Sequence, residues 1–279
     1  MHTPSTDGVS VALHDLGGRG RPLLISHATG FHGRVYQPLA TALHDEYHSV
    51  ALDYRGHGDT PQPIDVPTDW ERYSDDAQAA AHTMRQPMAA FGHSMGGACL
   101  LMSAHREPNL FDGLVIYEPI VFPHLDTATV HDEHNGGSML AVGARRRRAT
   151  FDSYDAALAN FSAKPPMNRF DPVAREAYVR HGFSEDIDGR VHLKCRPELE
   201  AATYDMGGRH TTWNALPSIE VPVLVIAGRP DPGTPAELAV QISERLPRGR
   251  YLQLDDLDHF GPMTHPGVVA DAVRDFLVQ

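Results

Sequence analysis

Residues 92–96 read Gly-His-Ser-Met-Gly, a G-x-S-x-G pentapeptide whose serine could act as a nucleophile. The apolar run over 88–91 predicts a strand before it, and the stretch over 95–105, rich in Ala, Leu and Met, predicts a helix after it. A serine on such a sharp strand-to-helix turn has its hydroxyl exposed, and the residues two before and two after it must be small. The start of the helix adds positive potential and free N–H groups where an oxyanion would develop. The pentapeptide therefore predicts that Ser94 is the nucleophile of an acyl transfer.

With this motif in this setting, the sequence resembles the α/β-hydrolase superfamily, in its capped, serine-nucleophile branch. The resemblance covers nearly the whole chain outside a middle segment, and it implies the chain order Ser, then Asp or Glu, then His. Asp231 follows the apolar run over 221–227, where the superfamily usually places its acid, and His259 follows the run over 250–254, where it places its base. The resemblance thus implies a triad of Ser94, Asp231 and His259. In it the imidazole takes the serine proton and the aspartate holds the imidazole in the right tautomer.

Other carboxylates near these runs keep the identity of the acid open. Glu118, directly after the apolar run over 113–117, is the rival because some relatives place the acid there. Asp231 could instead be a turn former, since it lies between two prolines. Asp256 and Asp258 are too close in sequence to the base to be favoured, and we expect them to cap the loop.

The segment 27–31, His-Ala-Thr-Gly-Phe, resembles the oxyanion loop of the same superfamily, with an alanine in place of the usual first glycine. By position, the resemblance assigns the two oxyanion donors to the backbone N–H groups of Thr29 and Met95. Phe31 would line the acyl pocket, and we predict that His93 belongs to the substrate pocket as well. A plain strand-to-helix turn is the alternative interpretation of this loop.

Three further polar segments are expected to have structural roles. Segment 53–58, Asp-Tyr-Arg-Gly-His-Gly, also resembles a common superfamily segment, and Asp53 and Arg55 are expected to brace loops beside the site. The four arginines over 145–148 could attract an anionic substrate such as a phosphopantetheine thioester, but such a run is more often a solvated helix face. The segment 131–134, His-Asp-Glu-His, has helical ligand spacing but no obvious third ligand, so we predict no metal site. A chain without a G-x-G-x-x-G or P-loop motif is also expected to bind no nucleotide cofactor.

The elements that must position these residues are short apolar runs that alternate with helical patterns. Strands are predicted over 9–13, 22–26, 49–52, 88–91, 113–117, 221–227 and 250–254, and helices over 35–43, 73–84, 95–105, 235–246 and 267–277. This alternation predicts an α/β fold with a mostly parallel central sheet flanked by helices. Ligands bind beyond the carboxyl ends of the strands in such sheets, which is where the candidate residues fall.

Between residues 123 and 217 the pattern changes. Strand-like runs vanish, and charged helical stretches such as 144–150 and 172–180 replace them. We therefore predict a helical cap insertion over 123–217, carried by an α/β-hydrolase core made of residues 1–122 and 218–279. The cap should set the size and polarity of the substrate.

Composition excludes several classes of protein. The 279 residues fit one large domain, and the net charge of −12 argues against nonspecific binding to nucleic acid. Two cysteines, Cys99 and Cys195, are too few for a disulfide framework and suit a reducing compartment. The polar N-terminus shows no secretory signal, and no apolar segment is long enough to span a membrane, so we expect a cytoplasmic location. The sequence does not predict the oligomeric state.

Together these features predict a serine hydrolase that cleaves a carboxylic ester of a small molecule through an acyl-enzyme, without a cofactor or metal. A thioester, a lactone or a carbon–carbon bond would use the same residues, so these substrates stay open. Serine as nucleophile disfavours epoxide hydrolysis and hydrolytic dehalogenation, for which the superfamily uses an aspartate. A non-catalytic relative that binds a small ligand in the same pocket is the alternative of another class, and the intact Ser, His and Asp set argues against it.

Overall fold

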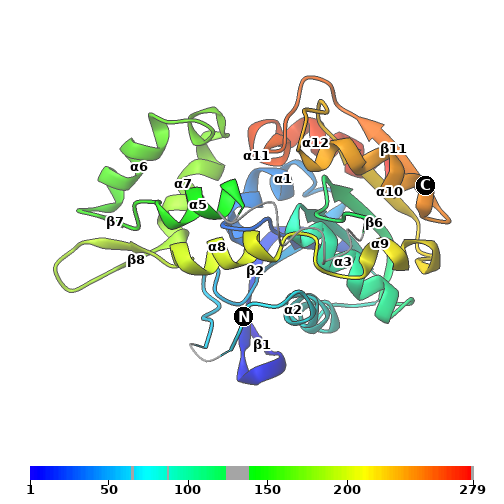
Figure 1. The fold of residues 1–279 in the computed structure, drawn as a ribbon, viewed down its shortest axis with the longest axis horizontal. Coiled ribbons are helices and arrows are strands. Elements are labelled where there is room, and N and C mark those ends of the chain that lie inside the picture. The colour runs from blue at the N-terminus through cyan, green and yellow to red at the C-terminus, as the bar shows by residue number, and fades with distance from the viewer. Residues whose placement is uncertain (64–65, 87, 124–137, 278–279) are drawn as a thin grey trace.

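The computed structural model describes residues 1–63, 66–86, 88–123 and 138–277, so the motif over 131–134 lies outside the described residues. Its centre is an eight-stranded sheet in the order β1-β2-β4-β3-β5-β6-β10-β11. In Figure 1 the helices labelled α5 to α8 lie at one side of the molecule, and α10, α12 and β11 lie at the other. The strands β1 (His2–Pro4) and β2 (Ser10–Gly18) are antiparallel to each other, and β2 is antiparallel to β4 (Tyr47–Asp53). All pairs from β4 onward are parallel. The mostly parallel sheet expected from the sequence is therefore confirmed.

The remaining strands of the sheet match the predicted apolar runs, with ends that differ by at most two residues. They are β3 (Arg21–Ser26), β5 (Met88–His93), β6 (Phe111–Tyr117), β10 (Val223–Ala227) and β11 (Gly249–Gln253). Every residue of β5 and of β10 is buried. Apolar side chains on both faces are what a central strand covered by helices requires.

Helices cover both faces of the sheet. Side chains of α2 (Trp70–His82), α3 (Met95–Arg106) and α10 (Ala239–Arg245) share one apolar cluster with Leu24, Ala90 and Ile116. Those of α1 (Gln37–Ala42) and α12 (Pro266–Leu277) share the other cluster with Ile25 and Phe91. Successive strand residues point to opposite faces, so neighbours such as Ala90 and Phe91 belong to different clusters.

Short helical turns connect these elements. They are η1 (Thr6–Gly8), η2 (Gly33–Tyr36), α9 (Thr212–Ala215), η4 (Leu216–Ser218), η5 (Pro235–Leu238) and α11 (Gly261–Thr264). The helix predicted over 35–43 is thus divided into η2 and α1, and the one over 235–246 into η5 and α10.

The segment from 138 to about 210 does not join the main sheet. It contains α5 (Met139–Arg145), α6 (Tyr154–Ser162), η3 (Met167–Arg169), α7 (Pro172–Gly182) and α8 (Pro197–Met206). It also contains a three-stranded antiparallel sheet of β7 (Thr150–Phe151), β9 (Val191–Leu193) and β8 (Phe183–Glu185). The expectation that this segment lacks strands was wrong, because strands of two or three residues are too short to show a periodic pattern. The helix predicted over 172–180 is confirmed as α7. The helical stretch predicted over 144–150 was wrong, because α5 ends at Arg145 and residue 150 begins β7. The boundaries of the cap at 123 and 217 remain a prediction.

None of the helices in the described part of the chain is long and apolar enough to cross a bilayer.

Candidate active site

Ser94 lies on the expected turn between β5 and α3. Its φ is 56° and its ψ is −116°, a strained conformation for a residue with a Cβ. The backbone of the turn is fixed from both sides, since the Ser94 N–H donates to the Tyr117 carbonyl at 2.9 Å and the Ser94 carbonyl accepts from Ile120 at 3.3 Å. These bonds join the turn to the end of β6, the next strand of the sheet.

The two glycines that flank the serine are required by the packing of the turn. A Cβ at Gly92 would lie 2.8 Å from the Gly97 Cα and 2.9 Å from the Gly96 carbonyl oxygen. One at Gly96 would overlap the carbonyl of Ser26 at the end of β3. Both distances are shorter than van der Waals contact, which agrees with the sequence-based expectation that these positions must be small.

His259 lies in the loop after β11, and its imidazole pairs with Glu118. The distance from His259 Nδ1 to Glu118 Oε2 is 2.6 Å, and the other carboxylate oxygen accepts the Gly228 N–H at 2.8 Å. Glu118 is 1% exposed and the His259 side chain is 26% exposed. A carboxylate that accepts the Nδ1 proton leaves His259 Nε2 free to act as a base.

Asp231 does not contact His259, so the assignment of Asp231 as the partner of the imidazole is corrected to Glu118. The Asp231 side chain is 58% exposed and lies 3.9 Å from the Arg229 guanidinium. Its carbonyl accepts two bonds from Thr234, as in a turn. Asp231 therefore has the turn-forming role that was the alternative interpretation from the sequence. Asp258 is also away from the imidazole and pairs with Arg169 at 2.8 Å.

The loop over 27–31 turns tightly beside the serine. The Phe31 N–H donates to the Ala28 carbonyl at 3.2 Å, and Gly30 has a φ of 77°. The Ala28 N–H donates to the Tyr36 hydroxyl at 3.1 Å and is therefore engaged, which agrees with the choice of Thr29 as the donor. Met95 is the first residue of α3, and N–H groups in the first turn of a helix have no intrahelical acceptor. The oxyanion roles of Thr29 and Met95 remain predictions.

Phe31 extends from this loop into a group of aromatic rings that joins three parts of the chain. Its ring centroid lies 6.0 Å from that of Phe170, 5.5 Å from that of Tyr178 and 6.3 Å from that of Phe260. Phe31 and Phe260 are partly exposed, and the Phe260 ring lies 5.7 Å from the His259 ring. These four aromatic residues, which we call the aromatic cluster, form an apolar wall next to the imidazole.

His93 was expected in the substrate pocket, and the structure corrects this. Its ring is fully buried, with Nδ1 at 2.8 Å from the Tyr36 hydroxyl and Nε2 at 2.8 Å from the His259 carbonyl. Both ring nitrogens are therefore engaged within the protein, and no face of the ring is open to a ligand.

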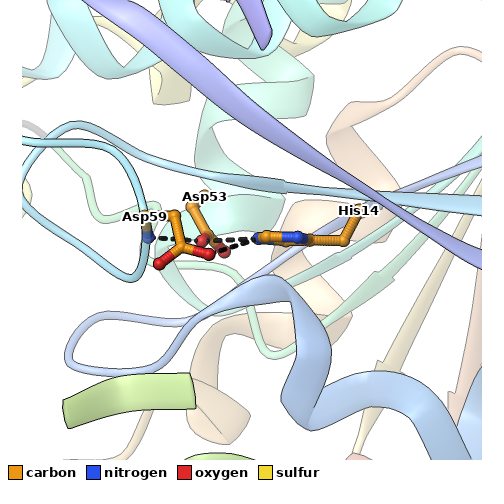
Figure 2. A group of neighbouring side chains, drawn as sticks. All are labelled: His14, Asp53 and Asp59. Atoms are coloured by element: carbon orange, nitrogen blue, oxygen red, sulfur yellow. Dashed lines mark hydrogen bonds and ion pairs between the residues drawn. The ribbon is translucent and has the colours of Figure 1, made fainter. Parts of the chain in front are cut away.

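Asp53 lies in a cluster of side chains that resembles a metal site. His14, Asp53 and Asp59 bring their potential ligand atoms within 4.8 Å of one another (Figure 2). The Asp53 carboxylate, however, accepts the N–H groups of Gly33 at 2.7 Å and Asp59 at 2.8 Å, besides its 2.7 Å contact with His14 Nε2. The Lys194 ammonium pairs with Asp59 at 2.5 Å and adds positive charge. We therefore interpret the group as a hydrogen-bonded brace between loops, in line with the sequence-based expectation for Asp53.

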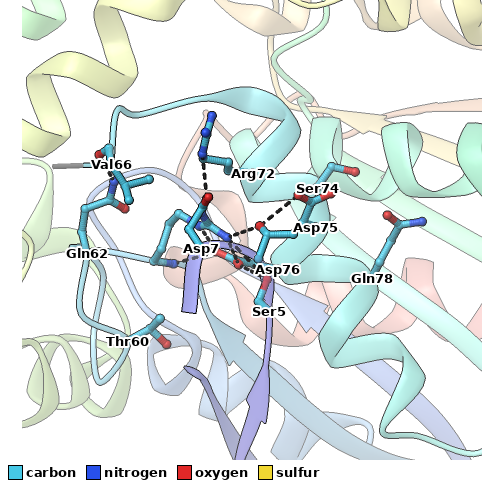
Figure 3. A network of polar contacts seen from close by, with 12 residues as sticks. Ser5, Asp7, Thr60, Gln62, Val66, Arg72, Ser74, Asp75, Asp76 and Gln78 are labelled. Atoms are coloured by element: carbon cyan, nitrogen blue, oxygen red, sulfur yellow. Dashed lines mark hydrogen bonds and ion pairs between the residues drawn. The ribbon is translucent and has the colours of Figure 1, made fainter. Parts of the chain in front are cut away.

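Arg55 is fully buried and braces a second set of loops. It makes a bidentate contact with Asp76, at 2.9 Å from Nε and 2.7 Å from an Nη, and donates to Asp7 at 2.9 Å. Figure 3 shows that Ser5, Asp7 and Asp76, which all contact Arg55, lie close together. The pairing ties the N-terminal segment to α2, so Arg55 has the structural role that the sequence favoured.

The arginines over 145–148 are largely engaged within the segment. Arg145 pairs with Asp205, and Arg148 lies over the Phe151 ring at 4.3 Å. Arg147 donates to Glu200 and to the Tyr178 hydroxyl. A Cβ at Gly30 would lie 2.6 Å from the Glu200 carboxylate, so the Arg147–Glu200 pair packs directly against the loop over 27–31.

The chain matches a known family and is similar to named hydrolases. A family model described as serine aminopeptidase, S33, matches residues 20–259. Human monoglyceride lipase is 25% identical over 217 residues, which are 75% of this chain and 64% of that protein. The 2-(acetamidomethylene)succinate hydrolase of Mesorhizobium japonicum is 23% identical over 267 residues, or 93% of this chain and 89% of that protein.

The fold has close structural counterparts. The crystal structure of an E-2-(acetamidomethylene)succinate hydrolase superimposes with a TM-score of 0.80 at 20% identity, covering 100% of this chain and 99% of that one. The α/β-hydrolase fold expected from the resemblance is thereby confirmed.

Proposed function

Because the chain belongs to the serine aminopeptidase S33 family, an enzyme family of the α/β-hydrolase type, we propose that it cleaves carboxylic esters of small molecules through an acyl-enzyme on Ser94. The observation that carries the proposal is the strained Ser94 turn together with an imidazole that a buried carboxylate orients. The ring of His93, the residue before Ser94, lies 4.9 Å from this imidazole. A structural turn would have no need of a buried Glu118 fixed by both Gly228 and His259.

Acylation follows from this arrangement. Ser94 Oγ attacks the ester carbonyl while His259 Nε2 takes its proton, and Glu118 stabilises the imidazolium that forms. The tetrahedral oxyanion is stabilised by the N–H groups of Thr29 and Met95 and by the N-terminus of α3. The imidazolium then gives its proton to the departing alkoxide, so that an alcohol leaves.

Deacylation uses the same groups in reverse. His259 Nε2 takes a proton from water, which attacks the acyl carbonyl, and the carboxylic acid leaves as Ser94 Oγ regains a proton. The aromatic cluster supports an apolar side of the substrate, because Phe31 and Phe260 are partly exposed next to the imidazole.

The first experiment is intact-mass analysis after treatment with a fluorophosphonate, on the wild type and on Ser94→Ala. One adduct on the wild type and none on the variant is the expected result, because only an activated serine reacts rapidly. An unlabelled, folded wild type would contradict the acyl-enzyme mechanism and favour the non-catalytic ligand-binding alternative.

A substrate panel then separates the classes that share these residues. It compares esters, thioesters, lactones and β-diketones of matched acyl length, and we expect the highest kcat/KM for esters. The Arg147–Glu200 pair beside the loop over 27–31 gives a reason to include methyl esters with and without a second, free carboxylate. The relative named as a 2-(acetamidomethylene)succinate hydrolase adds to that reason.

We also propose that the segment over 123–217 acts as a cap over the site and that the protein is cytoplasmic. The contacts of Phe170 and Tyr178 with Phe31 support the first proposal. The two cysteines, both buried and unpaired, support a reducing compartment.

A further inference from the structure

His93, the residue that precedes the nucleophile, connects the three loops that the proposed mechanism needs. Its Nδ1 contacts the Tyr36 hydroxyl, which in turn accepts the N–H of Ala28 in the oxyanion loop. Its Nε2 contacts the main-chain carbonyl of His259. One buried imidazole therefore joins the oxyanion loop, the serine turn and the loop of the base.

The direction of every hydrogen bond in this chain is determined by chemistry. The His259 carbonyl can only accept, so His93 Nε2 must carry the proton. In a neutral imidazole the Nδ1 of His93 then accepts, and the donor is the Tyr36 hydroxyl. The hydroxyl oxygen is left to accept from the Ala28 N–H, which is the bond that the structure contains. Each donor has one acceptor, so the chain is satisfied in a single tautomer.

The surroundings of His93 keep it in this neutral form. Burial lowers the pKa of His93 well below its usual value. The charge of the nearby His259 lowers it further, against a smaller opposing effect of the hydrogen bond to the His259 carbonyl. The rings of His93 and His259 lie 4.9 Å apart, and the Tyr117 ring packs edge-on against His93 at 5.6 Å. If His93 were protonated, its Nδ1 would also donate toward the Tyr36 hydroxyl. The hydroxyl proton would then have no acceptor among these four residues.

His259 is thus held at two separate points. Glu118 orients its side chain through Nδ1, and His93 fixes its main chain through the carbonyl. The neighbouring Asp258 carbonyl accepts the Tyr117 hydroxyl at 2.7 Å, which restrains the same loop. A general base must stay within hydrogen-bond reach of its proton, and a displacement of about 1 Å can lower a rate by roughly 100-fold.

We propose that His93 is a positioning residue, which acts through the hydrogen-bond chain Ala28–Tyr36–His93–His259 to hold the base and the oxyanion loop at one spacing around Ser94. The proposal rests on the proposed function of Ser94 and His259, and it assigns His93 no proton transfer to substrate. It also explains why a polar side chain occupies a fully buried position at the end of β5.

The test compares the wild type with His93→Leu, His93→Gln, Tyr36→Phe and, as a matched control, Tyr73→Phe. Tyr73 is also a buried tyrosine, but its hydroxyl contacts Thr203 at 2.9 Å and takes no part in the hydrogen-bond chain through His93. Hydrolysis of p-nitrophenyl acetate is normalised to the serines titrated by a fluorophosphonate, so that unfolded protein does not count. Melting temperatures are measured for all five proteins.

We expect His93→Leu to lower kcat by about 100-fold while KM changes less than about threefold, because the base is displaced but the pocket is intact. His93→Gln should recover most of the loss, since its amide N–H can donate to the His259 carbonyl. Tyr36→Phe should lower kcat by about tenfold, and Tyr73→Phe should leave it unchanged at a similar loss of melting temperature. A normal kcat per titrated serine in Tyr36→Phe and in any folded His93 variant would overturn the proposal.

Nuclear magnetic resonance of the protein labelled with ¹⁵N-histidine gives a readout that does not depend on turnover. We expect His93 to be neutral at pH 7, with the proton on Nε2. The 2.6 Å contact with Glu118 should move the His259 Nδ1 proton to low field, and we expect this signal to shift in Tyr36→Phe. A proton on Nδ1 of His93, or a His259 signal that does not change in Tyr36→Phe, would contradict the proposed hydrogen-bond chain. If the wild type neither reacts with the fluorophosphonate nor cleaves esters, the proposed function fails, while these signals still decide whether His93 positions His259.

Discussion

Like Ser94, Glu118 follows directly after a strand and has a positive φ, of 43°, which is a strained conformation. Its carboxylate accepts the Gly228 N–H and pairs with the His259 imidazole. We expect Glu118→Gln to lower kcat for ester hydrolysis by roughly 10³- to 10⁴-fold, because the amide cannot stabilise the imidazolium. The measurement is kcat with active-site titration, together with circular dichroism to verify folding.

The matched control at this scale is Asp231→Asn. Asp231 is exposed and away from the imidazole, so kcat should remain within about twofold of wild type. If Asp231→Asn were the variant with the large loss and Glu118→Gln the mild one, the acid would be Asp231 and the pairing seen here would not be the catalytic one.

At the scale of elements, the turn between β5 and α3 depends on glycine. Gly96→Ala should lower the free energy of unfolding by about 1–3 kcal/mol, because the new methyl group overlaps the Ser26 carbonyl and forces β3 and α3 apart. Gly143→Ala, in α5, has no atom within 4 Å of the new methyl group and should raise stability by up to about 1 kcal/mol. Urea denaturation of both variants tests the contrast, and equal stabilities would refute it.

The Arg55–Asp76 pair connects elements in a different way, through charge rather than packing. Asp76→Ala should lower the free energy of unfolding by about 3–5 kcal/mol, since it leaves a fully buried guanidinium without its bidentate partner. The control is Asp45→Ala, which breaks an ion pair with Arg19 at the surface and should change stability by less than about 1 kcal/mol. Thermal and urea denaturation measure both, and a small effect of Asp76→Ala would mean that the N-terminal segment is not held through Arg55.

At the scale of the whole molecule, buried histidines predict acid sensitivity. Burial lowers the pKa of His27 to about 3 and the pKa values of His32 and His57 to about 4, from an ordinary 6.5. The unfolded chain binds protons at these positions below pH 6.5 and the folded chain does not. The stabilisation is therefore complete above pH 6.5 and is lost as the pH falls from 6.5 toward 4.

Burial also lowers the pKa of His93 well below its usual value, which makes four such groups. Together they imply that stability falls by roughly 5 kcal/mol per pH unit near pH 5. Urea denaturation at pH 7, 6 and 5 measures this slope. His57→Gln should reduce the slope by about one quarter, whereas His265→Gln, at an exposed position, should not change it. A flat stability between pH 7 and pH 5 would contradict the prediction.

The sequence by itself determined what is encoded within a few neighbouring residues. Alternating apolar runs and helical patterns predict the mostly parallel sheet, because burial on both faces requires continuous apolar strands. The serine turn can be predicted because the two positions that must be glycine, Gly92 and Gly96, lie within one pentapeptide. The bracing roles of Asp53 and Arg55 were also predicted.

Only the tertiary structure decided which groups meet across the sheet. Tyr117 and Ile226 are register partners in the neighbouring strands β6 and β10, so Glu118 and the start of the loop after β10 leave the sheet at the same level. Glu118 is the first residue after β6, and its positive φ turns the backbone at the edge of the sheet. Asp231 lies four residues beyond Ala227, and its side chain is exposed to solvent. In the same way, His93 has its partners at Tyr36 and His259, which are 57 and 166 residues away. Local patterns carry no information about contacts at such separations, because the packing of distant segments creates them.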